Sequence, residues 1–560
     1  MILGYSAAQV RAAEASLLAA GPPAELMERA AFALAVRVAR ELRQRRGRVA
    51  GAGVLVLVGP GNNGGDALFA GAELARRGVR VLAVLTSSSV HDAGLAALRA
   101  AGGRVVRAVD DLPDGAVPVD DLPDGAVPDD DVPDFALPDG AATGPRWVGP
   151  VLAGVESADV VLDGLLGIGA RGPVRGVAAE VVALVAGLVD AANAEPGRPL
   201  VVAVDTPSGI DVDDGALPGP AAAPDPVALF GPGVLPADLT VTFGAAKAGL
   251  LLPPASGVVG MIDVVDLGLD LAGVVPVVAR LERSDVAGLW PVPGSSSHKY
   301  DRGVLGVVAG TPRYPGAAVL TVTAAVRAGV GMVRYVGPPG VTATVVAARP
   351  EVVAGYGRVQ AWVVGPGVDP LDPPQAAHVR DALVAAHAAR LPVVVDAGAL
   401  DLLPDRVDPW VVLTPHAGEL ARLLAERGEI VERGDVEAHP LTWARRAHAL
   451  TGATVLLKGA TTVVVGAGGA AYSQQDAPAW LATAGAGDVL AGLLGALLAG
   501  RSDEVVADPT LAVALAAAAA SVHGLAAGRA RPGGPVAALD VADALPATIA
   551  ALLAVGDWRA

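Results

Sequence analysis

The sequence predicts an α/β protein of two domains, and three observations lead to this fold class. The chain has 560 residues, which is longer than one hydrophobic core usually serves. In both halves, apolar runs of strand length alternate with stretches of helical period, which favours parallel sheets covered by helices. The alternation pauses at residues 291–303, a segment rich in Gly, Ser and Pro. We therefore expect one domain over residues 1–280 and another over residues 281–560.

Composition narrows the class of protein. The chain has no cysteine, which excludes a disulfide scaffold, a thiolate nucleophile and a thiolate metal site. Although 52% of the residues are hydrophobic, we find no run of spanning length without a charge or a cluster of Gly and Pro. The N-terminus lacks the basic and apolar regions of an export signal. We therefore expect no membrane span, and we predict a cytoplasmic homo-oligomer.

The net charge of −17 comes largely from one segment. Residues 110–139 form three tandem decapeptides with eleven Asp and neither Lys nor Arg, so the rest of the chain carries about −6. This small charge argues against nucleic acid as a partner. The density of Pro and Asp predicts a disordered surface insert. A calcium-binding repeat is the alternative, which the prolines and the missing EF-hand spacing disfavour.

Lysine is rare and therefore informative. The chain has three lysines, Lys247, Lys299 and Lys458, against thirty-eight arginines. Because Arg serves wherever any cation would do, each remaining Lys could mark a place that needs a compact ammonium group. The alternative is that these three positions carry Lys by chance.

In the first half, helices are expected at residues 7–20 and 24–45, followed by a buried strand at 53–58. The strand enters a loop at residues 59–66, before another helix. A strand, a Gly-rich loop and a helix form an arrangement that cradles phosphate, although a tight structural turn would also explain the glycines. The loop's candidate binding residues are Asn62, Asn63, Gly64, Gly65 and Asp66.

Two further strands of this half end in aspartates. The run from residue 158 ends at Asp163 and leads into a flexible loop, and the run from residue 201 ends at Asp205, shortly before Ser208. Because ligands collect at the carboxyl ends of parallel strands, these residues and Asn63 could share one crevice. Their oxygens suit a hard cation and not zinc. The alternative is that both aspartates cap turns.

The motifs GPGNNGGD (59–66), DGLLGIG (163–169), DTPSG (205–209) and TVTFGAAKAGL (240–250) resemble the NAD(P)H-hydrate epimerase family, a Rossmann-like three-layer α/β/α module. The resemblance implies a K⁺ ion on Asn63, Asp163 and Ser208, with Asp205 as the acid/base at the hydrated nicotinamide ring. It also implies substrate contacts from the loop 62–66, from Asp205 and from a second loop formed by Gly167, Ile168, Gly169, Ala170, Arg171, Gly172 and Pro173. The acidic insert departs from the family pattern but lies between the motifs.

In the second half, strands are expected at 303–310, 361–367 and 392–396, with a helix of small residues from Tyr314. Small side chains at Ala317 and Gly367 would let a flat ligand approach. The run 411–420 ends in His416 and Glu419, which resemble a zinc pair; Pro415 and the lack of another His nearby favour a substrate-facing His and a Glu near phosphate-bound magnesium instead. Lys458 ends the next strand.

The stretch 482–500 reads as a small-residue loop entering an apolar helix. Gly485 and Gly487 let the backbone turn its N–H groups toward one point, where the helix adds its positive end, so an anion site for phosphate is expected. Beside it, Asp488 could take a proton from a hydroxyl held against the phosphate. The alternative is an acidic N-cap on a buried helix.

The motifs HKYDRG (298–303), LTPHAGEL (413–420), LLKGA (456–460) and ATAGAGDVLAG (482–492) resemble the NAD(P)H-hydrate dehydratase family, a ribokinase-like three-layer α/β/α fold. The resemblance implies a catalytic Asp488, use of ADP (giving AMP and phosphate) with Mg²⁺, and substrate contacts from Ala317, Gly367, His416 and Asp488. It places the nucleotide on Lys458, Gly459, Ala460, Thr461, Thr462 and Gly487. Two stretches depart from the pattern, Gly398 within V-D-A-G-A-L and the segment 476–480, and both could alter nucleotide contacts.

Together the motifs predict a fused enzyme that epimerises the R and S hydrates of NAD(P)H and dehydrates the S form. Its partners would be these hydrates and ADP or ATP. A ribokinase-like small-molecule kinase fused to a Rossmann-like binding domain is one alternative, disfavoured by the motifs of the first half. A binding or scaffold protein with degenerate sites is another, disfavoured by the intact Asp205, Asp488 and Lys458.

Overall fold

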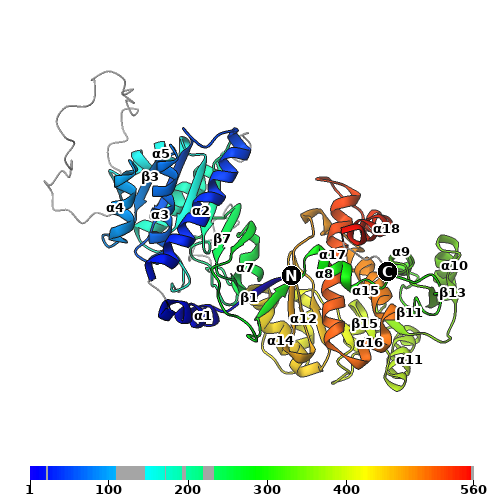
Figure 1. Cartoon of the computed structure of the whole chain (residues 1–560). Coiled ribbons are helices and arrows are strands. Elements are labelled where there is room, and N and C mark those ends of the chain that lie inside the picture. Colours follow the sequence, from blue (N-terminus) through cyan, green and yellow to red (C-terminus); the bar gives the residue numbers. More distant parts are fainter. Residues whose placement is uncertain (21–22, 109–144, 171, 192–196, 219–232, 556–560) are drawn as a thin grey trace, which may run out of the picture.

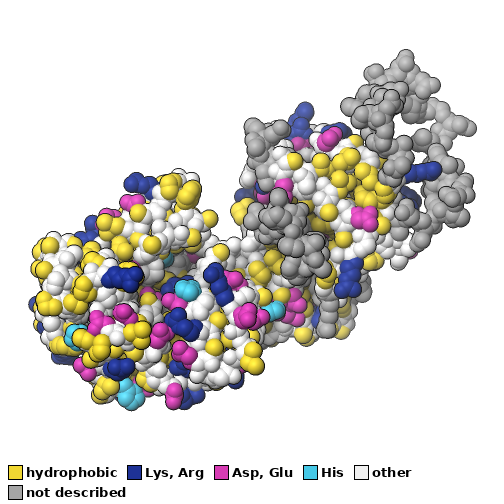
Figure 2. Space-filling model, turned by 180° about the vertical axis from the view of Figure 1, so that it is seen from behind, with side chains coloured by type: hydrophobic (Ala, Val, Ile, Leu, Met, Phe, Trp, Pro, Cys, Tyr) yellow, Lys and Arg dark blue, Asp and Glu magenta, His cyan; other side chains and the backbone are white. Residues whose placement is uncertain are grey.

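The computed structural model describes residues 1–20, 23–108, 145–170, 172–191, 197–218 and 233–555, and forms two lobes (Figure 1). Arg171 and the acidic decapeptides at 110–139 lie outside the described residues, so the expectations for them stay predictions. On the face shown in Figure 2, acidic and basic side chains are interspersed over the lobe of the second half.

The first lobe is built on a parallel sheet of seven strands in the order β4-β3-β2-β5-β6-β7-β9. Its strands are β2 (Gly53–Val58), β3 (Arg80–Leu85), β4 (Arg104–Arg107), β5 (Val160–Gly164), β6 (Leu200–Val204), β7 (Leu239–Phe243) and β9 (Met261–Val265). Its helices are α1 (Ala7–Ala20), α2 (Pro23–Arg46), α3 (Asn62–Arg76), α4 (Asp92–Ala100), α5 (Val148–Glu156), α6 (Val177–Ala191) and α7 (Ala248–Leu251).

Both faces of this sheet are covered, which explains the continuous apolar strand at 53–58. Val54 and Val56 pack with α2, α3 and α4, whereas Leu55 and Leu57 pack with α5 and α6. The expected Rossmann-like three-layer arrangement is therefore confirmed. One local expectation was wrong: the helix begins at Asn62, so the residues 62–66 form its first turn and not a loop before it.

The second lobe contains a mixed sheet of twelve strands in the order β13-β12-β11-β14-β15-β16-β17-β18-β19-β10-β1-β8. Its own strands are β11 (Val304–Val308), β12 (Met332–Val336), β13 (Val353–Ala354), β14 (Ala361–Val364), β15 (Val393–Val395), β16 (Val411–Leu413), β17 (Thr454–Leu457), β18 (Thr462–Val465) and β19 (Ala471–Gln474). In the order of the sheet, the strands from β13 through β12, β11, β14, β15 and β16 to β17 run parallel. Strands β17, β18 and β19 form an antiparallel meander.

Helices cover both faces of this sheet as well, which gives the expected ribokinase-like three layers. One layer, with the core around Leu305 and Val307, contains α8 (Arg283–Leu289), α9 (Pro315–Ala328), α10 (Pro339–Ala348), α15 (Ala486–Gly500), α16 (Ser502–Ala507), α17 (Thr510–Ala530) and α18 (Ala538–Val555). The other, with the core around Val304 and Val308, contains α11 (Pro373–Ala389), α12 (Ala417–Ala425), α13 (Arg433–Ala438) and α14 (Pro440–Thr451).

Helix α17 bears on the expectation that no segment spans a membrane. Among the described residues it is the one helix whose length and composition would suffice to cross a bilayer, and 78% of the relevant window is buried inside the protein. A buried core helix of a protein meets the same criteria of length and apolar composition.

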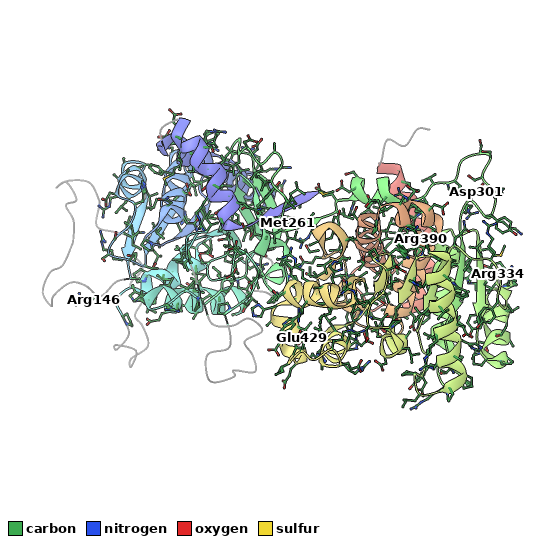
Figure 3. All side chains as sticks on the ribbon, turned by 90° about the horizontal axis from the view of Figure 1, so that it is seen from below. Arg146, Met261, Asp301, Arg334, Arg390 and Glu429 are labelled. Carbon is green, nitrogen blue, oxygen red and sulfur yellow. The ribbon has the colours of Figure 1, made fainter. Side chains whose placement is uncertain are left out.

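The two lobes share part of one sheet. The N-terminal strand β1 (Ile2–Tyr5) pairs with β10 (Val278–Arg280) and with β8 (Ala246–Lys247), and β10 pairs with β19. The N-terminus therefore lies at the junction of the lobes (Figure 1), where the amino group of Met1 contacts Glu282 and Asp285. In Figure 3 the labelled Met261 belongs to the first lobe, and Arg334 and Arg390 to the second. The domain boundary near residue 281 stays a prediction.

Candidate active sites

The first site lies where the strand order of the first sheet reverses. Strands β3 and β4 lie on one side of β2, and β5 lies on the other, so the segments that follow β2 and β5 flank a topological switch point. A cavity of about 920 Å³ opens there. Of the expected substrate residues, those that line it are Asn62, Asn63, Asp66, Gly167, Ile168, Gly169, Ala170 and Asp205.

Two of the other expected glycines, Gly64 and Gly65, have a packing role. A Cβ at Gly64 would lie 2.3 Å from the carbonyl oxygen of Gly59, and one at Gly65 would lie 3.0 Å from the ring of His91. These two glycines therefore allow close packing around the first turn of α3. Gly172 and Pro173 are not among the residues that line the cavity. Gly172 has a φ of +79°, a backbone conformation that favours glycine.

Asp205 follows β6 with a left-handed backbone, φ +65°. Its Oδ1 atom accepts hydrogen bonds from the ammonium of Lys247, from the backbone N–H of Phe243 (3.0 Å) and from the hydroxyl of Thr242 (3.2 Å). Lys247 is 1% exposed and also donates to the carbonyl of Phe243 (3.0 Å). The buried ammonium compensates the charge of Asp205 and fixes its carboxylate at the cavity wall, because an unpaired buried charge is costly.

Two more carboxyl groups line the same cavity. Burial, and then the charge of Asp205, raises the pKa of Asp66 well above its usual value. Burial likewise raises the pKa of Glu14, with Lys247 opposing the shift. The raised pKa of Asp66 and Glu14 favours the protonated form of both carboxyl groups, whereas Lys247 forms an ion pair with Asp205.

The three residues expected to bind a cation lie together. Asp163 is fully buried at the end of β5, where its Oδ2 accepts from the N–H of Ser208 (2.8 Å) and its Oδ1 accepts from the Ser208 hydroxyl (2.6 Å). Asn63 donates to the carbonyl of Leu166 (2.9 Å), while its buried Oδ1 has no hydrogen-bond partner among the described residues. Burial raises the pKa of Asp163 although Ser208 opposes the shift. An orphaned buried oxygen beside a carboxylate and a hydroxyl fits a hard monovalent cation.

The second site lies at the start of α15. Gly485 caps this helix with φ +85°, and Asp488 is in its first turn. Burial, and then the charge of Asp396, raises the pKa of Asp488 to about 7, with Lys458 opposing the shift. A carboxylate whose pKa lies near neutrality is suited to general base catalysis. A helix leaves N–H groups of its first turn without intrahelical partners, and these groups and the helix dipole favour an anion at the same place. The N–H of Ala486 is already used, because it donates to the carbonyl of Thr483 (3.3 Å).

Lys458 supplies positive charge to this anion site. It follows β17, and a Cβ on Gly487 would lie 3.4 Å from its ammonium, which places that ammonium over the first turn of α15. The ammonium donates to Asp396 (2.8 Å), which is 2% exposed at the end of β15, and lies 3.8 Å from Glu419. Burial is the largest single effect and lowers the pKa of Lys458, but the charges of Asp396, Glu419 and Asp488 and the hydrogen bond to Asp396 together raise it above its ordinary value. Lys458 therefore remains a cation at neutral pH.

His416 and Glu419 form a reciprocal cap on α12. The imidazole Nδ1 of His416 accepts from the N–H groups of Gly418 (3.1 Å) and Glu419 (3.3 Å), and Glu419 accepts from the N–H of His416 (2.8 Å). Among the described residues, no cluster of three or more His, Asp or Glu has a geometry that could hold a metal. The cap explains the three-residue spacing without zinc. The ring of His416 stays exposed, with its Nε2 atom 3.6 Å from Glu419.

Ala317 and Gly367 face each other at the switch point of the second sheet, between β11 and β14. Gly367 has φ +62°, and a Cβ there would lie 2.6 Å from the Cβ of Ala317. The remaining expected nucleotide residues, Gly459, Ala460, Thr461 and Thr462, make the turn from β17 to β18 and its first strand residue. The structure thus gathers the turn, Lys458 and Gly487 around one end of α15.

The two departures from the family pattern have structural contexts. A Cβ on Gly398 would lie 2.2 Å from the carbonyl oxygen of Val368, so a larger residue does not fit this backbone. Partial burial of its carboxyl group raises the pKa of Asp476, with Ser521 and Arg280 opposing the shift. Asp476 accepts a hydrogen bond from the buried Gln474 (3.3 Å), whereas Trp480 is exposed.

Sequence reasoning missed the roles of three residues. Lys247 had been singled out by the rarity of lysine, but its pairing with Asp205 depends on the fold. Asp396 ends a strand, which was the available signal for its place beside Lys458. Glu14 had no signal, since it reaches the first site from α1, far from any motif. Lys299 is exposed and lies over the ring of Tyr300 (5.3 Å), so the argument from rare lysines holds for two of three.

The fold and the two sites define a fusion of a Rossmann-like module, with a charge-paired carboxylate in a cavity, and a ribokinase-like module, with a lysine and a carboxylate at a helix N-terminus. Comparisons with known families agree: the model described as "YjeF-related protein N-terminus" matches residues 23–249, and the model described as "NAD(P)H-hydrate dehydratase" matches residues 305–546. The chain belongs to the family of bifunctional NAD(P)H-hydrate repair enzymes.

Relatives support this membership over most of the chain. The bifunctional NAD(P)H-hydrate repair enzyme Nnr of Mycobacterium tuberculosis strain H37Rv is 43% identical over 88% of this chain and 89% of its own length. The enzyme of the same name from Corynebacterium glutamicum is 34% identical over 98% of both. Among solved structures, the ADP/ATP-dependent NAD(P)H-hydrate dehydratase of Bacillus subtilis, co-crystallised with ATP and Mg²⁺, is 26% identical over 49% of this chain and 99% of that one, with a TM-score of 0.43.

Proposed function

We propose that this chain repairs hydrated NADH and NADPH in two steps, each carried out by one lobe. The first lobe interconverts the R and S hydrates, and the second removes water from the S hydrate at the expense of a nucleotide phosphate. The observation that carries this proposal is the presence, in one chain, of a charge-paired Asp205 in an open cavity and of Asp488 at a helix N-terminus beside Lys458.

In the first reaction, inversion at the hydrated ring carbon requires its C–OH bond to break as the departing hydroxyl takes up a proton, and to form again on the opposite face as the incoming water loses one. Asp205, held by Lys247 and the N–H of Phe243, is the base that takes the proton of the incoming water. Asp66, whose raised pKa favours its protonated form, is the acid that protonates the departing hydroxyl. The segments 62–66 and 167–173 bind the rest of the substrate.

A potassium ion fits the oxygen cluster of the first lobe. Asn63 offers its unpartnered Oδ1, and Asp163 and Ser208 offer a carboxylate and a hydroxyl. When bound there, the ion would add positive charge next to the segment that follows β5, at the edge of the cavity. The cluster itself anchors that segment, because the Ser208 hydroxyl accepts from the N–H of Leu166 (2.9 Å).

In the second reaction, hydroxide is a poor leaving group and phosphate a good one. Asp488 removes the proton of the ring hydroxyl, which then accepts the phosphoryl group. Lys458 and the first-turn N–H groups of α15 hold the charge of that group. Phosphate then leaves, the neighbouring ring carbon gives up a proton that the departing phosphate can accept, and the ring double bond of the reduced cofactor is restored. Mg²⁺, when bound, would offset phosphate charge, and Glu419, 3.8 Å from the Lys458 ammonium, is the carboxylate that would hold it. ADP, giving AMP and phosphate, is the proposed co-substrate, bound by Lys458, Gly487 and the turn 459–462.

The test uses S-hydrated NADH, incubated with the protein, Mg²⁺ and either ADP or ATP, with the absorbance of reduced nicotinamide as the readout. Recovery of NADH that depends on the nucleotide is expected. A small-molecule kinase would instead phosphorylate a sugar or alcohol without recovering NADH, and a scaffold would bind ligand without turnover. Either of these results would refute the proposal. The compartment and the oligomeric state stay predictions.

A further inference from the structure

The segment 248–256 of the first half packs into the second lobe next to the turn assigned to the nucleotide. Ala248, Leu251 and Leu252 belong to the same buried cluster as Leu457 and Val463, which flank that turn. The short helical turn η2 (Ala255–Gly257) continues this segment. The cluster makes the segment a fixed wall and not a loose neighbour, because buried apolar contacts of this kind are close-packed.

Two hydrogen bonds connect η2 with the second lobe. The hydroxyl of Ser256 lies 2.8 Å from that of Thr461, and the side-chain amide of Gln475 donates to the backbone carbonyl of Ser256 (2.9 Å). Ser256 is 2% exposed and Thr461 is 5% exposed. The Thr461 hydroxyl is therefore turned away from the open site. It forms its hydrogen bond with Ser256, which lies 205 positions earlier in the chain.

Ser256 lies outside both matched regions, 23–249 and 305–546, so neither family model covers it. The structure assigns Ser256 as a positioning residue for the nucleotide: through Thr461 it fixes the turn 458–461, so that the epimerase lobe completes the nucleotide site of the dehydratase lobe. This inference rests on the proposed function of that turn. Its physical basis is the conformation of the turn, since backbone N–H groups bind phosphate well when they are held in place.

The first experiment compares Ser256→Ala with wild type in the full chain. The variant leaves a buried threonine hydroxyl without its partner, so the turn loses its anchor and the KM for ADP should rise about 3- to 10-fold, the usual scale for one hydrogen bond. The kcat of dehydration and the rate of epimerisation should stay close to wild type, while the unpartnered hydroxyl should lower the melting temperature by only a few degrees. Ser502→Ala is the matched control, because Ser502 is a buried serine that begins α16.

A second set of variants separates positioning from general damage. Thr461→Val removes the other hydroxyl with little change of shape, and Ser256→Ala should add nothing to the KM in that background if the two hydroxyls act as a pair. Thr461→Ser keeps a hydroxyl and should retain a KM for ADP near that of wild type.

The affinity for ADP with Mg²⁺ is also measured by calorimetry, so that the outcome does not depend on turnover. An unchanged KM and Kd in Ser256→Ala, additive effects in the double variant, or a joint fall of kcat and melting temperature in Ser256→Ala would overturn the inference. A wild type without nucleotide-dependent dehydration would refute the proposed function, while the calorimetric Kd values would still decide the role of Ser256.

Discussion

Replacing Asp488 by Asn separates its proposed role as a base from a purely structural role in the first turn of α15, where Gly485, and not Asp488 as the alternative supposed, is the N-cap. The pKa of Asp488 is about 7 in the folded protein, against an ordinary value of 3.8, mainly because the carboxyl group is buried. Folding therefore favours the protonated form, and stability from this group is lost as the pH rises from the unfolded to the folded pKa. A difference of about three pH units corresponds to at most about 4 kcal/mol above pH 7.

The helix N-terminus and water in the open site reduce this figure. The dipole of α15 favours the carboxylate by up to about 1 kcal/mol, and screening removes a further part, so about 2 kcal/mol is expected. Asn has no charge to bury, and the N-cap Gly485 is unchanged in the variant. Asp488→Asn should therefore be more stable than wild type by about 2 kcal/mol at pH 8, a rise of roughly 4–8 °C in the melting temperature of this lobe. The gain should vanish near pH 4.

The assay measures thermal unfolding at pH 4, 6 and 8 together with dehydration rate and ADP affinity. The variant should bind ADP with little loss, while turnover falls by about 10²–10⁴, the usual contribution of a positioned general base. An active variant, or one whose stability relative to wild type does not change with pH, would remove Asp488 from the mechanism. A purely structural role of Asp488 predicts an active variant.

Four further predictions concern single features. Asp205→Ala should abolish interconversion of the R and S hydrates while S-specific dehydration stays near normal; loss of both activities in a folded variant would contradict this. Lys247→Met leaves Asp205 as a buried unpaired charge, so unfolding should become easier by about 3–5 kcal/mol at pH 8, measured by denaturant titration, and an unchanged midpoint would show that the pair is dispensable. Deletion of 110–139 should leave the melting temperature unchanged, because a surface insert contributes little beyond loop-closure entropy; a large fall would show that the repeats pack. The kcat/KM for dehydration should rise with pH through about 7, since Asp488 must lose its proton to act as a base, and a flat profile would argue against that role.

The layers of both lobes could be predicted from the sequence because their strands are buried on both faces. The run 53–58 is continuously apolar, since alternate residues meet helices on opposite sides of the sheet. The structure likewise brings Asn63, Asp163 and Ser208 together, as expected from strands that end at one edge. Such inferences succeed because each depends on the chain near the residue concerned.

The junction of the lobes could not be predicted in this way. Strand β1 has four residues and pairs with segments more than 240 positions away, so its own sequence says nothing of its partners. The contacts of Lys247 with Asp205 and of Ser256 with Thr461 depend in the same way on long-range packing. The two halves therefore carry separate motif sets but not wholly separate sites.

The most direct test of the account is the recovery of NADH from an equal mixture of R and S hydrates, with ADP and Mg²⁺ present. Wild type should convert the whole mixture, because the first lobe supplies S hydrate as the second consumes it. Asp205→Ala should stop at about half, since the R hydrate then remains. Recovery that stops at half in wild type would contradict the first activity, and absence of recovery would contradict the account as a whole.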